Sequence, residues 1–406
     1  MLKLLFILTT LLTDTAATEV SVQGTYGQSM MAVAGVRNGG FAVEANAIYD
    51  FQDSGHRVFG EAGYTWNESR DNHWVENCDY ERLYPLLTCD TVGGDMHTET
   101  YHFRGGYRML KKNVLWHIAL EYSARQAYRT KDPRPKNKVA DLQLDASVGF
   151  TAKEHAFSWV AQVGRYKQNN DIKFYSELGE AMVYHLITTD GEYARFNSFK
   201  SAYYHGYNAG LCFALQPFER GFLAELAYNY TTVTKELSSS TAIPIATLRT
   251  HGVSARFGYT TPVWRVSVSG SWLQRGVWQA VYGDAASNNY ELLMREQRYA
   301  EQHYSVGAAG SYTLALPVGK MTFAATADWQ ASAVRQQTSS QRFKELGDEL
   351  LSPQMGINAA VRYAFPIHKT PKLNLSWFFR PQFDYTRYTK TTHQSWQVVL
   401  STGICF

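Results

Sequence analysis

The segment that decides the fold is Gln394-Ser-Trp-Gln-Val-Val-Leu-Ser-Thr-Gly-Ile-Cys-Phe406. Its apolar side chains fall at alternate positions, with Thr402 as the one interruption: Trp396, Val398, Leu400, Ile404 and Phe406. Successive side chains of a β-strand point to opposite faces, so this period of two predicts a strand with one apolar face. A final strand that ends in an aromatic residue is typical of bacterial outer-membrane β-barrels.

The same alternation recurs along the whole chain. We expect about sixteen strands, near 19–27, 40–51, 55–67, 97–110, 113–128, 139–152, 155–168, 197–215, 220–235, 246–260, 263–278, 302–316, 319–335, 353–366, 372–388 and 394–406. Fourteen is the alternative count, because the first two runs are weakly patterned. An even number of antiparallel strands predicts an all-β fold, a transmembrane up-and-down β-barrel.

The connections between these runs alternate between short and long. Tight turns are expected at 111–112, 153–154, 217–219, 261–262 and 317–318, and long polar stretches near 68–96, 129–138, 169–196, 236–245, 279–301 and 336–352. Membrane barrels have short periplasmic turns and long external loops, whereas a soluble β-sandwich has no reason to alternate in this way. A barrel of this size encloses a water-filled pore unless loops close it, and 68–96, 169–196 and 279–301 are the candidates to fold inward.

One face of the expected strands is apolar and the other is charged. In 113–128, for example, Trp116, Ile118 and Leu120 alternate with polar residues. A charge facing lipid costs about 2–4 kcal/mol at the bilayer midplane, so the charged face is expected to line the lumen. The lumen-lining candidates are Arg57, Glu61, Arg104, Arg108, His117, Glu121, Arg125, Asp141, Asp145, Glu225, Arg256, Arg265, Asp328, Arg362, Arg380 and Asp384. These charges either pair across strands and stiffen the wall or line a polar conduit, and no ring of one sign indicates ion selectivity.

Composition agrees with a barrel and excludes several other classes. The 406 residues are 14% aromatic and 18% charged, with a net charge of +3 and a mean hydropathy of −0.32. Such a chain is too polar for a helical membrane protein, too aromatic for a disordered one and too weakly basic to suggest a nucleic-acid partner. Residues 1–17 have one lysine, a short apolar run and small residues at the end, which predicts a signal peptide. Residues 18–406 then form a single barrel domain in the outer membrane of a Gram-negative cell.

Cys78 and Cys89 lie close together in the polar stretch 68–96. In an oxidising compartment they could form a disulfide, and two free or metal-binding thiols are the alternative. Acidic residues of the same stretch, Asp79, Glu81, Asp90 and Asp95, have the spacing of no EF-hand loop, so no metal site is assigned. No cofactor motif occurs in the sequence.

Two segments carry a family resemblance. They are Asp79-Tyr-Glu-Arg-Leu-Tyr-Pro85, continuing through Asp90-Thr-Val-Gly-Gly-Asp95 to Glu99-Thr-Tyr-His-Phe-Arg-Gly-Gly-Tyr107, and Asp132-Pro-Arg-Pro-Lys-Asn137. They resemble an uncharacterised outer-membrane β-barrel family of the Bacteroidota type. The resemblance implies location and fold, and it implies no activity, since the family has no settled one. The basic side chains of 132–137 are expected either to contact lipopolysaccharide phosphates or to form a rigid solvated loop.

We expect no enzymatic activity, since the nearest candidate for an outer-wall hydrolase, His205, has Tyr207 where a nucleophile would be needed. The expected function is porin-like: passive passage or capture of a polar or amphiphilic solute, alone or as an accessory to a larger uptake complex. The alternative is a closed structural or docking barrel that anchors partner proteins at the cell surface, and a hydrolase comes third. The expected partners are outer-membrane lipid, lipopolysaccharide and proteins of an uptake complex.

Overall fold

The structure is a computed structural model that describes residues 18–29, 35–51, 55–176, 180–188, 200–238, 242–283, 291–336, 343–369, 374–389 and 393–405. The expected signal peptide and Phe406 lie outside these residues. The strands of the wall are β1 (Glu19–Ser29), β2 (Arg37–Asp50), β3 (His56–Asn72), β5 (Gly94–Lys111), β6 (Val114–Tyr128), β7 (Arg134–Ala152), β8 (His155–Lys173), β10 (Ser201–Pro217), β11 (Gly221–Ser238), β12 (Ala242–Thr260), β13 (Trp264–Tyr282), β14 (Leu292–Ala315), β15 (Lys320–Gln336), β16 (Gln354–Lys369), β17 (Asn374–Tyr388) and β18 (Gln394–Cys405).

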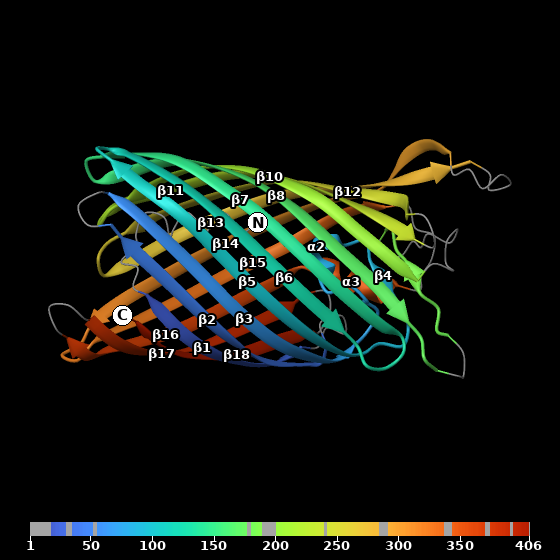
Figure 1. Cartoon of the computed structure of the whole chain (residues 1–406), viewed down its shortest axis with the longest axis horizontal. Coiled ribbons are helices and arrows are strands. Elements are labelled where there is room, and N and C mark those ends of the chain that lie inside the picture. Colours follow the sequence, from blue (N-terminus) through green and yellow to red (C-terminus); the bar gives the residue numbers. More distant parts are fainter. Residues whose placement is uncertain are drawn as a thin grey trace.

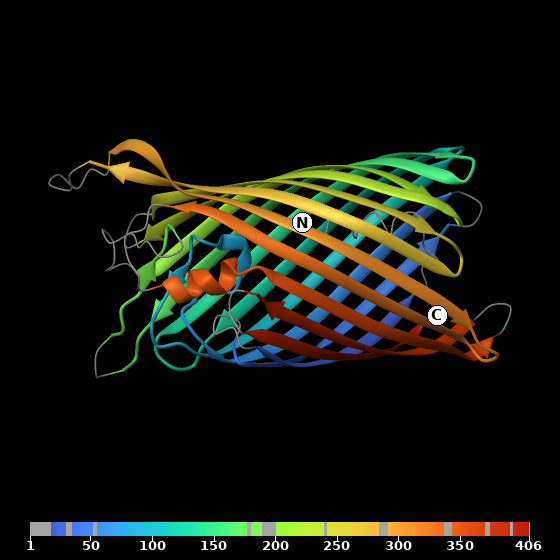
Figure 2. The ribbon, with the colours of Figure 1, turned by 180° about the vertical axis from the view of Figure 1, so that it is seen from behind.

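These sixteen strands form one closed antiparallel barrel, in which each strand pairs with its sequence neighbours in the wall. The ring closes between β1 and β18, where Glu19 lies opposite Cys405 and Ser29 lies opposite Ser395. The long tilted strands are seen from two sides in Figures 1 and 2. The predicted all-β barrel and its count of about sixteen strands are therefore confirmed. Within the described residues no helix is long and apolar enough to cross a membrane, a finding that does not bear on spans made of strands.

Short and long connections lie at opposite ends of the barrel, as the sequence indicates. Lys112 and Asn113 join β5 to β6, and Lys153 and Glu154 join β7 to β8, at the end that we call the tight-turn end. The other end, the long-loop end, holds the small elements β4, α2 and α3 (Figure 1).

Some of the predicted long loops are strand. Residues 134–138 belong to β7, and only 239–241 separate β11 from β12. The stretch 279–301 was wrongly assigned as a loop that folds inward, because β13 and β14 continue as a hairpin that projects beyond the wall (Figure 2). A strand that extends past the apolar belt meets water on both faces and loses its alternation, so polarity alone does not distinguish it from a loop.

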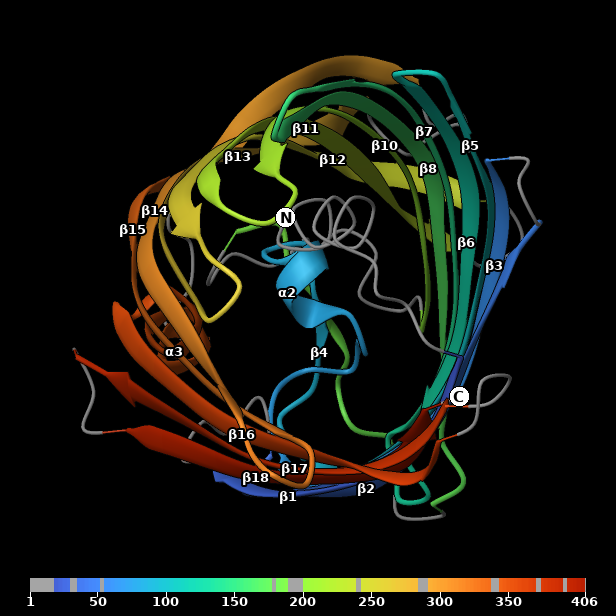
Figure 3. The ribbon, with the colours of Figure 1, turned by 90° about the vertical axis from the view of Figure 1, so that its left-hand side faces the viewer.

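Two other segments do fold inward. The connection after β3 carries α2 (Tyr80–Leu83) and β4 (Thr88–Cys89), and the connection after β8 carries β9 (Tyr184–His185). Thr88 pairs with His185 and Cys89 with Tyr184, so the two connections form a small sheet of their own. Seen along the barrel, α2 and β4 lie inside the ring of strands (Figure 3). We call residues 73–93 and 180–188 the plug.

The interior of the molecule is built around this plug. Buried apolar side chains of the plug form one cluster with inward side chains of the wall and with Phe343 and Leu346. The last two belong to the connection between β15 and β16, which contains α3 (Lys344–Leu351). The Phe343 ring packs edge-on against Trp74 at 5.7 Å and Tyr184 at 5.2 Å, so α3 holds the plug from the side.

Candidate functional site: the plug and its seat in the barrel

An apolar contact seals the plug against the wall. Leu83, Leu86 and Leu87 are fully buried, and they share a cluster with inward side chains of β10 to β14. The wall contributes Tyr204, Val233, Leu237, Leu248, Val277 and Tyr299. Each buried leucine contributes about 1.5–3 kcal/mol, so the plug is held by an apolar core and not by loops resting in water.

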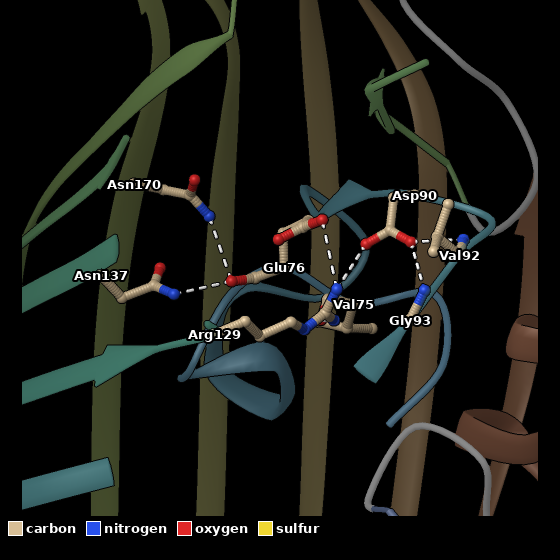
Figure 4. A network of polar contacts seen from close by, with 8 residues as sticks. All are labelled: Val75, Glu76, Asp90, Val92, Gly93, Arg129, Asn137 and Asn170. Atoms are coloured by element: carbon tan, nitrogen blue, oxygen red, sulfur yellow. Dashed lines mark hydrogen bonds and ion pairs between the residues drawn. The ribbon is translucent and has the colours of Figure 1, made fainter. Parts of the chain in front are cut away.

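Arg129 anchors the plug at the end of β6. Its guanidinium donates to Asp90 Oδ2 at 2.7 Å, to Glu76 Oε1 at 3.4 Å and to the carbonyl of Val75 at 2.8 Å (Figure 4). All three charged side chains are fully buried. Breaking such a group by removing one member leaves a charge buried without compensation, which typically costs about 3–5 kcal/mol.

The backbone around these charges is also saturated with hydrogen bonds. Asn137 of β7 and Asn170 of β8 both donate to the carbonyl of Glu76, at 2.7 and 3.2 Å (Figure 4). Asp90 Oδ1 accepts from the amides of Val92 and Gly93, each at 2.6 Å, and so closes the turn that leads back to β5. Three wall strands therefore hold one short stretch of the plug.

The two carboxyl groups of the anchor differ in protonation. Burial raises the pKa of Glu76 well above its ordinary value, and the neighbouring Asp90 raises it further while Arg129 opposes the shift. Burial acts in the same sense on Asp90, but hydrogen bonds from Glu76, Arg129 and the Gly93 amide outweigh it and hold the pKa of Asp90 below its ordinary value. A neutral Glu76 beside an ionised Asp90 leaves one negative charge to balance Arg129.

Lys235 of β11 makes the second anchor. It is fully buried, and its Nζ donates to the carbonyl of Leu87 at 2.6 Å. Next to it, the hydroxyls of Tyr204 and Thr88 lie 2.9 Å apart, and Thr88 Oγ1 is 3.4 Å from His185 Nδ1. Polar groups of β10 and β11 thus satisfy polar groups of β4 and β9, and β11 lies four strands from β6 in the ring.

The α2 segment docks on β6, β7 and β8 through charges of opposite sign. Asp79 pairs with Arg125 and accepts from the Tyr166 hydroxyl at 3.0 Å. Arg82 pairs with Asp141 at 2.6 Å and lies 3.9 Å above the Tyr166 ring. Plug acids meet wall bases and a plug base meets a wall acid, so the fit is electrostatically complementary.

The sixteen residues chosen from sequence as lumen-lining share one face of the wall in the strand register, the face that contacts the plug. Arg125 and Asp141 seat the plug directly. Several others pair with each other or with a wall residue: Arg57 with Asp50, Glu61 with Arg104, Glu121 with His102, Glu225 with Arg256, and Arg362 with Glu19. Cross-strand pairing of this kind accounts for these charges as parts of the wall, without a ligand.

The remaining candidates lie in more varied surroundings. His117 stacks on Phe59, with ring centroids 5.5 Å apart. Asp145 accepts from Gln162, Asp328 from Gln330, Asp384 from Gln382, and Arg380 donates to Gln382. Arg108 lies between Arg57 and His117 in the register, and Arg265 lies between Thr260 and Ser311.

Three residues that hold the plug, Arg129, Asn137 and Lys235, were not predicted from the sequence. Asn137 precedes Asp141 by four residues on the inward parity of β7, which was predicted to begin only at 139. Lys235 lies within the predicted strand 220–235 and has the inward parity of Glu225, so the pattern could have identified it. Arg129 follows Arg125 by four residues but lies one residue beyond the predicted and observed end of β6, where strand parity gives no signal. The prediction of a rigid solvated loop over 132–137 was wrong, because residues 134–137 begin β7 and Asn137 is fully buried.

Cys78 and Cys89 are not joined in the structure, so the disulfide hypothesis is corrected. Cys78 Sγ is directed at Gln168 Oε1, 4.0 Å away on the wall, whereas Cys89 is fully buried in β4. Burial raises the pKa of both thiols. Over the described ranges, no group of three or more His, Cys, Asp or Glu side chains is placed to hold a metal ion.

The fold and its seated plug define a closed sixteen-stranded barrel with an occupied lumen. The chain belongs to the Family of unknown function (DUF6850), whose model matches residues 6–350. The resemblance to an uncharacterised family is confirmed in this respect, and its Bacteroidota type stays a prediction. No curated protein matches the chain.

Among solved structures, the chain is similar to BauA, the ferric preacinetobactin receptor from Acinetobacter baumannii, at 8% identity and a TM-score of 0.42, with 95% of this chain and 80% of that one covered. It is similar to the CymD monoaromatic hydrocarbon channel at 10% identity and a TM-score of 0.38, with 96% of this chain and 88% of that one covered. It is also similar to a loop-deletion mutant of OmpT, an outer membrane protein of Vibrio cholerae, at 8% identity and a TM-score of 0.39, with 95% of this chain and 98% of that one covered. Likeness this distant carries no argument about function.

Proposed function

We propose that this protein is an outer-membrane barrel closed by its own plug, and that it serves as a docking or anchoring barrel at the cell surface. The observation that carries the proposal is the plug itself. Its leucines are fully buried against the wall, and Arg129 and Lys235 hold it at two separate points. A plug that packs inside the ring against β10 to β14 favours the closed alternative over an open porin-like pore.

The outer surface supports the membrane location. Trp116, Ile118 and Leu120 of β6 are 51%, 49% and 50% exposed, and equivalent outward apolar side chains occur on the other strands of the wall. Burying such a surface is favourable by roughly 25 cal/mol per Å², so a continuous belt of this kind matches acyl chains better than water. Aromatic side chains at the belt, such as Tyr122 and Tyr207, suit the interface between chains and headgroups.

A second candidate is passage or capture of a polar or amphiphilic solute, alone or as an accessory to an uptake complex. The inward charges outside the plug contact favour it, because Arg380 and Asp384 lie on the lumenal face away from the apolar cluster. Passage requires the plug to leave its seat.

We propose no catalytic step. His205 lies on the outward face of β10, with its Nδ1 3.6 Å from Glu236.

Conductance in a planar lipid bilayer tests the closed state. We expect the wild-type barrel to show no ion conductance. A variant in which a Gly-Ser linker replaces residues 76–90 should show stepwise increases in conductance. Stepwise conductance of equal size in the wild type would reject closure and favour the pore. A lipase and protease screen, with His205→Ala as the paired variant, tests the absence of catalysis, and activity that depends on His205 would overturn it.

A further inference from the structure

The strands that seat the plug carry a second feature on their opposite face. Along β7 and β8, at the long-loop end, inward side chains such as Val139 and Gln168 are buried. Five of the outward side chains between them are basic and exposed, Lys136, Lys138, Arg165, Lys167 and Lys173, and Asp171 is the one acid among the outward side chains of these two strands. We call Lys138, Arg165 and Lys167 the basic triad.

The triad is compact. Lys138 lies opposite Asn169 in the register and so is diagonal to Lys167, and such neighbours are about 7–8 Å apart. Arg165 and Lys167 are two residues apart on one strand, or about 7 Å. The Arg165 guanidinium is 5.8 Å from the ring centre of Tyr207, one of the aromatic residues at the edge of the belt.

The cations of this face outnumber its acids. In the part of the chain that the structure describes, inward cations such as Arg125 and Arg129 are in ion pairs, but none of the triad is. One acid, Asp171, lies on the same outward face, opposite Lys136 and diagonal to Lys138, and it accepts a hydrogen bond from Ser201. Like charges at neighbouring sheet positions are destabilising, and one carboxylate does not offset the five cations of this face, which therefore favours an added anion.

An apolar groove of about 850 Å³ lies on the same outer face, towards the tight-turn end. Its lining includes Trp116 of β6, Val148 of β7, Ala161 of β8, Phe213 of β10 and Leu226 of β11, which are five consecutive strands of the wall. Ala161 precedes Arg165 by four residues on β8, or about 13 Å along the strand. A molecule with an anionic head and long apolar chains can therefore bind the triad and the groove at once.

We propose that this face binds lipopolysaccharide, with lipid A phosphate on Lys138, Arg165 and Lys167 and an acyl chain in the groove. The proposal rests on the membrane location proposed above. Charge complementarity identifies the occupant: Lys136 and Lys173 extend the basic surface beyond the reach of one phosphodiester, which favours a broad phosphorylated glycolipid over a glycerophospholipid. The face also lies at the end with long loops, which in membrane barrels is external.

Native mass spectrometry of the full chain in detergent, titrated with purified lipid A, tests this site. The triple variant Lys138→Gln, Arg165→Gln, Lys167→Gln is compared with the matched variant Lys111→Gln, Lys153→Gln, Lys320→Gln, which removes three exposed cations from the tight-turn end. We expect the triad variant to weaken binding by about tenfold or more and the control to leave it unchanged. Ala161→Trp, which fills the groove, is expected to weaken binding with the triad intact.

Two ligand arms separate the alternatives. Dephosphorylated lipid A is expected to bind as weakly to the wild type as lipid A binds to the triad variant, and phosphatidylglycerol is expected to bind weakly to both. Equal binding of lipid A to wild type and triad variant would overturn the site, and phosphatidylglycerol binding as tight as lipid A would overturn the choice of lipopolysaccharide. Either result, with the protein still inserted in bilayers and silent, leaves the closed barrel intact.

Discussion

At the scale of single residues, the plug depends on one buried acid that stays neutral. Glu76 has a raised pKa, so the seated plug favours the protonated form, and its stability is full at low pH. As the pH rises above the ordinary value of 4.5, the released plug gives up its proton more easily and the seated form loses stability. Asp90 has a lowered pKa, so the stability that its ionised form gives to the seated plug is present above its ordinary pKa of 3.8 and is lost only as the pH falls below that value.

The variant Glu76→Gln keeps the shape and removes the ionisation. We expect the protection of the amide of Leu186, which bonds to the carbonyl of Leu87, to fall in the wild type as the pH rises above 4.5, the ordinary pKa of Glu76. In Glu76→Gln it should stay level over the same range. The measurement is hydrogen exchange, corrected for intrinsic rates, and a parallel decline in both proteins would contradict the assignment of a neutral Glu76.

Arg129→Ala removes the cation of the anchor. Because the Asp90 carboxylate would then lie buried without a cation to compensate its charge, we expect the plug to lose about 3–5 kcal/mol and to leave its seat. Arg70→Ala is the matched control, since Arg70 pairs with Glu68 at 3.1 Å but is more than half exposed, and it should cost less than about 1 kcal/mol. Conductance should appear in Arg129→Ala only, and equal silence in both variants would show that the anchor is dispensable.

At the scale of elements, the wall was predictable and the plug was not. The alternation of Trp116, Ile118 and Leu120 with polar residues arises from two solvents, lipid and lumen, and any strand between them must show it. The plug has no such constraint. Thr88 and Cys89 pair with residues almost a hundred positions later, and a pairing of two residues leaves no periodic trace.

The role of α3 also escaped prediction, because its loop position suggested a solvated connection. Its contact with the plug gives a test: Phe343→Ala removes a fully buried ring that packs on Trp74 and Tyr184. We expect a cost of about 3–5 kcal/mol, confined to β4, β9 and α3. Hydrogen exchange should rise at the amide of Glu76, which bonds to Thr88, and not at wall amides; a uniform rise over the wall would mean that plug and barrel unfold together.

At the scale of the whole molecule, one wall must satisfy two opposite surroundings. The same strands that present Leu120 and Leu144 outward present Glu121 and Asp145 inward, and a shift of one residue in register would exchange the two faces. The sequence therefore determines the barrel strongly. It determines the state of the lumen weakly, since the charges of an open conduit and those of a plugged barrel follow the same parity.

The outward belt predicts how a charge is tolerated with depth. Leu120→Arg places a cation among exposed apolar side chains of β6, and we expect refolding into lipid vesicles to lose about 2–4 kcal/mol of stability. Gln126→Arg lies six residues further along the same strand, or about 20 Å, beside the basic triad, where the cost should be under about 1 kcal/mol. Urea titrations of vesicle-inserted protein measure both. Since detergent micelles adapt around a charge, the difference should shrink in them, and equal costs for the two variants in vesicles would mean that the belt does not lie in acyl chains.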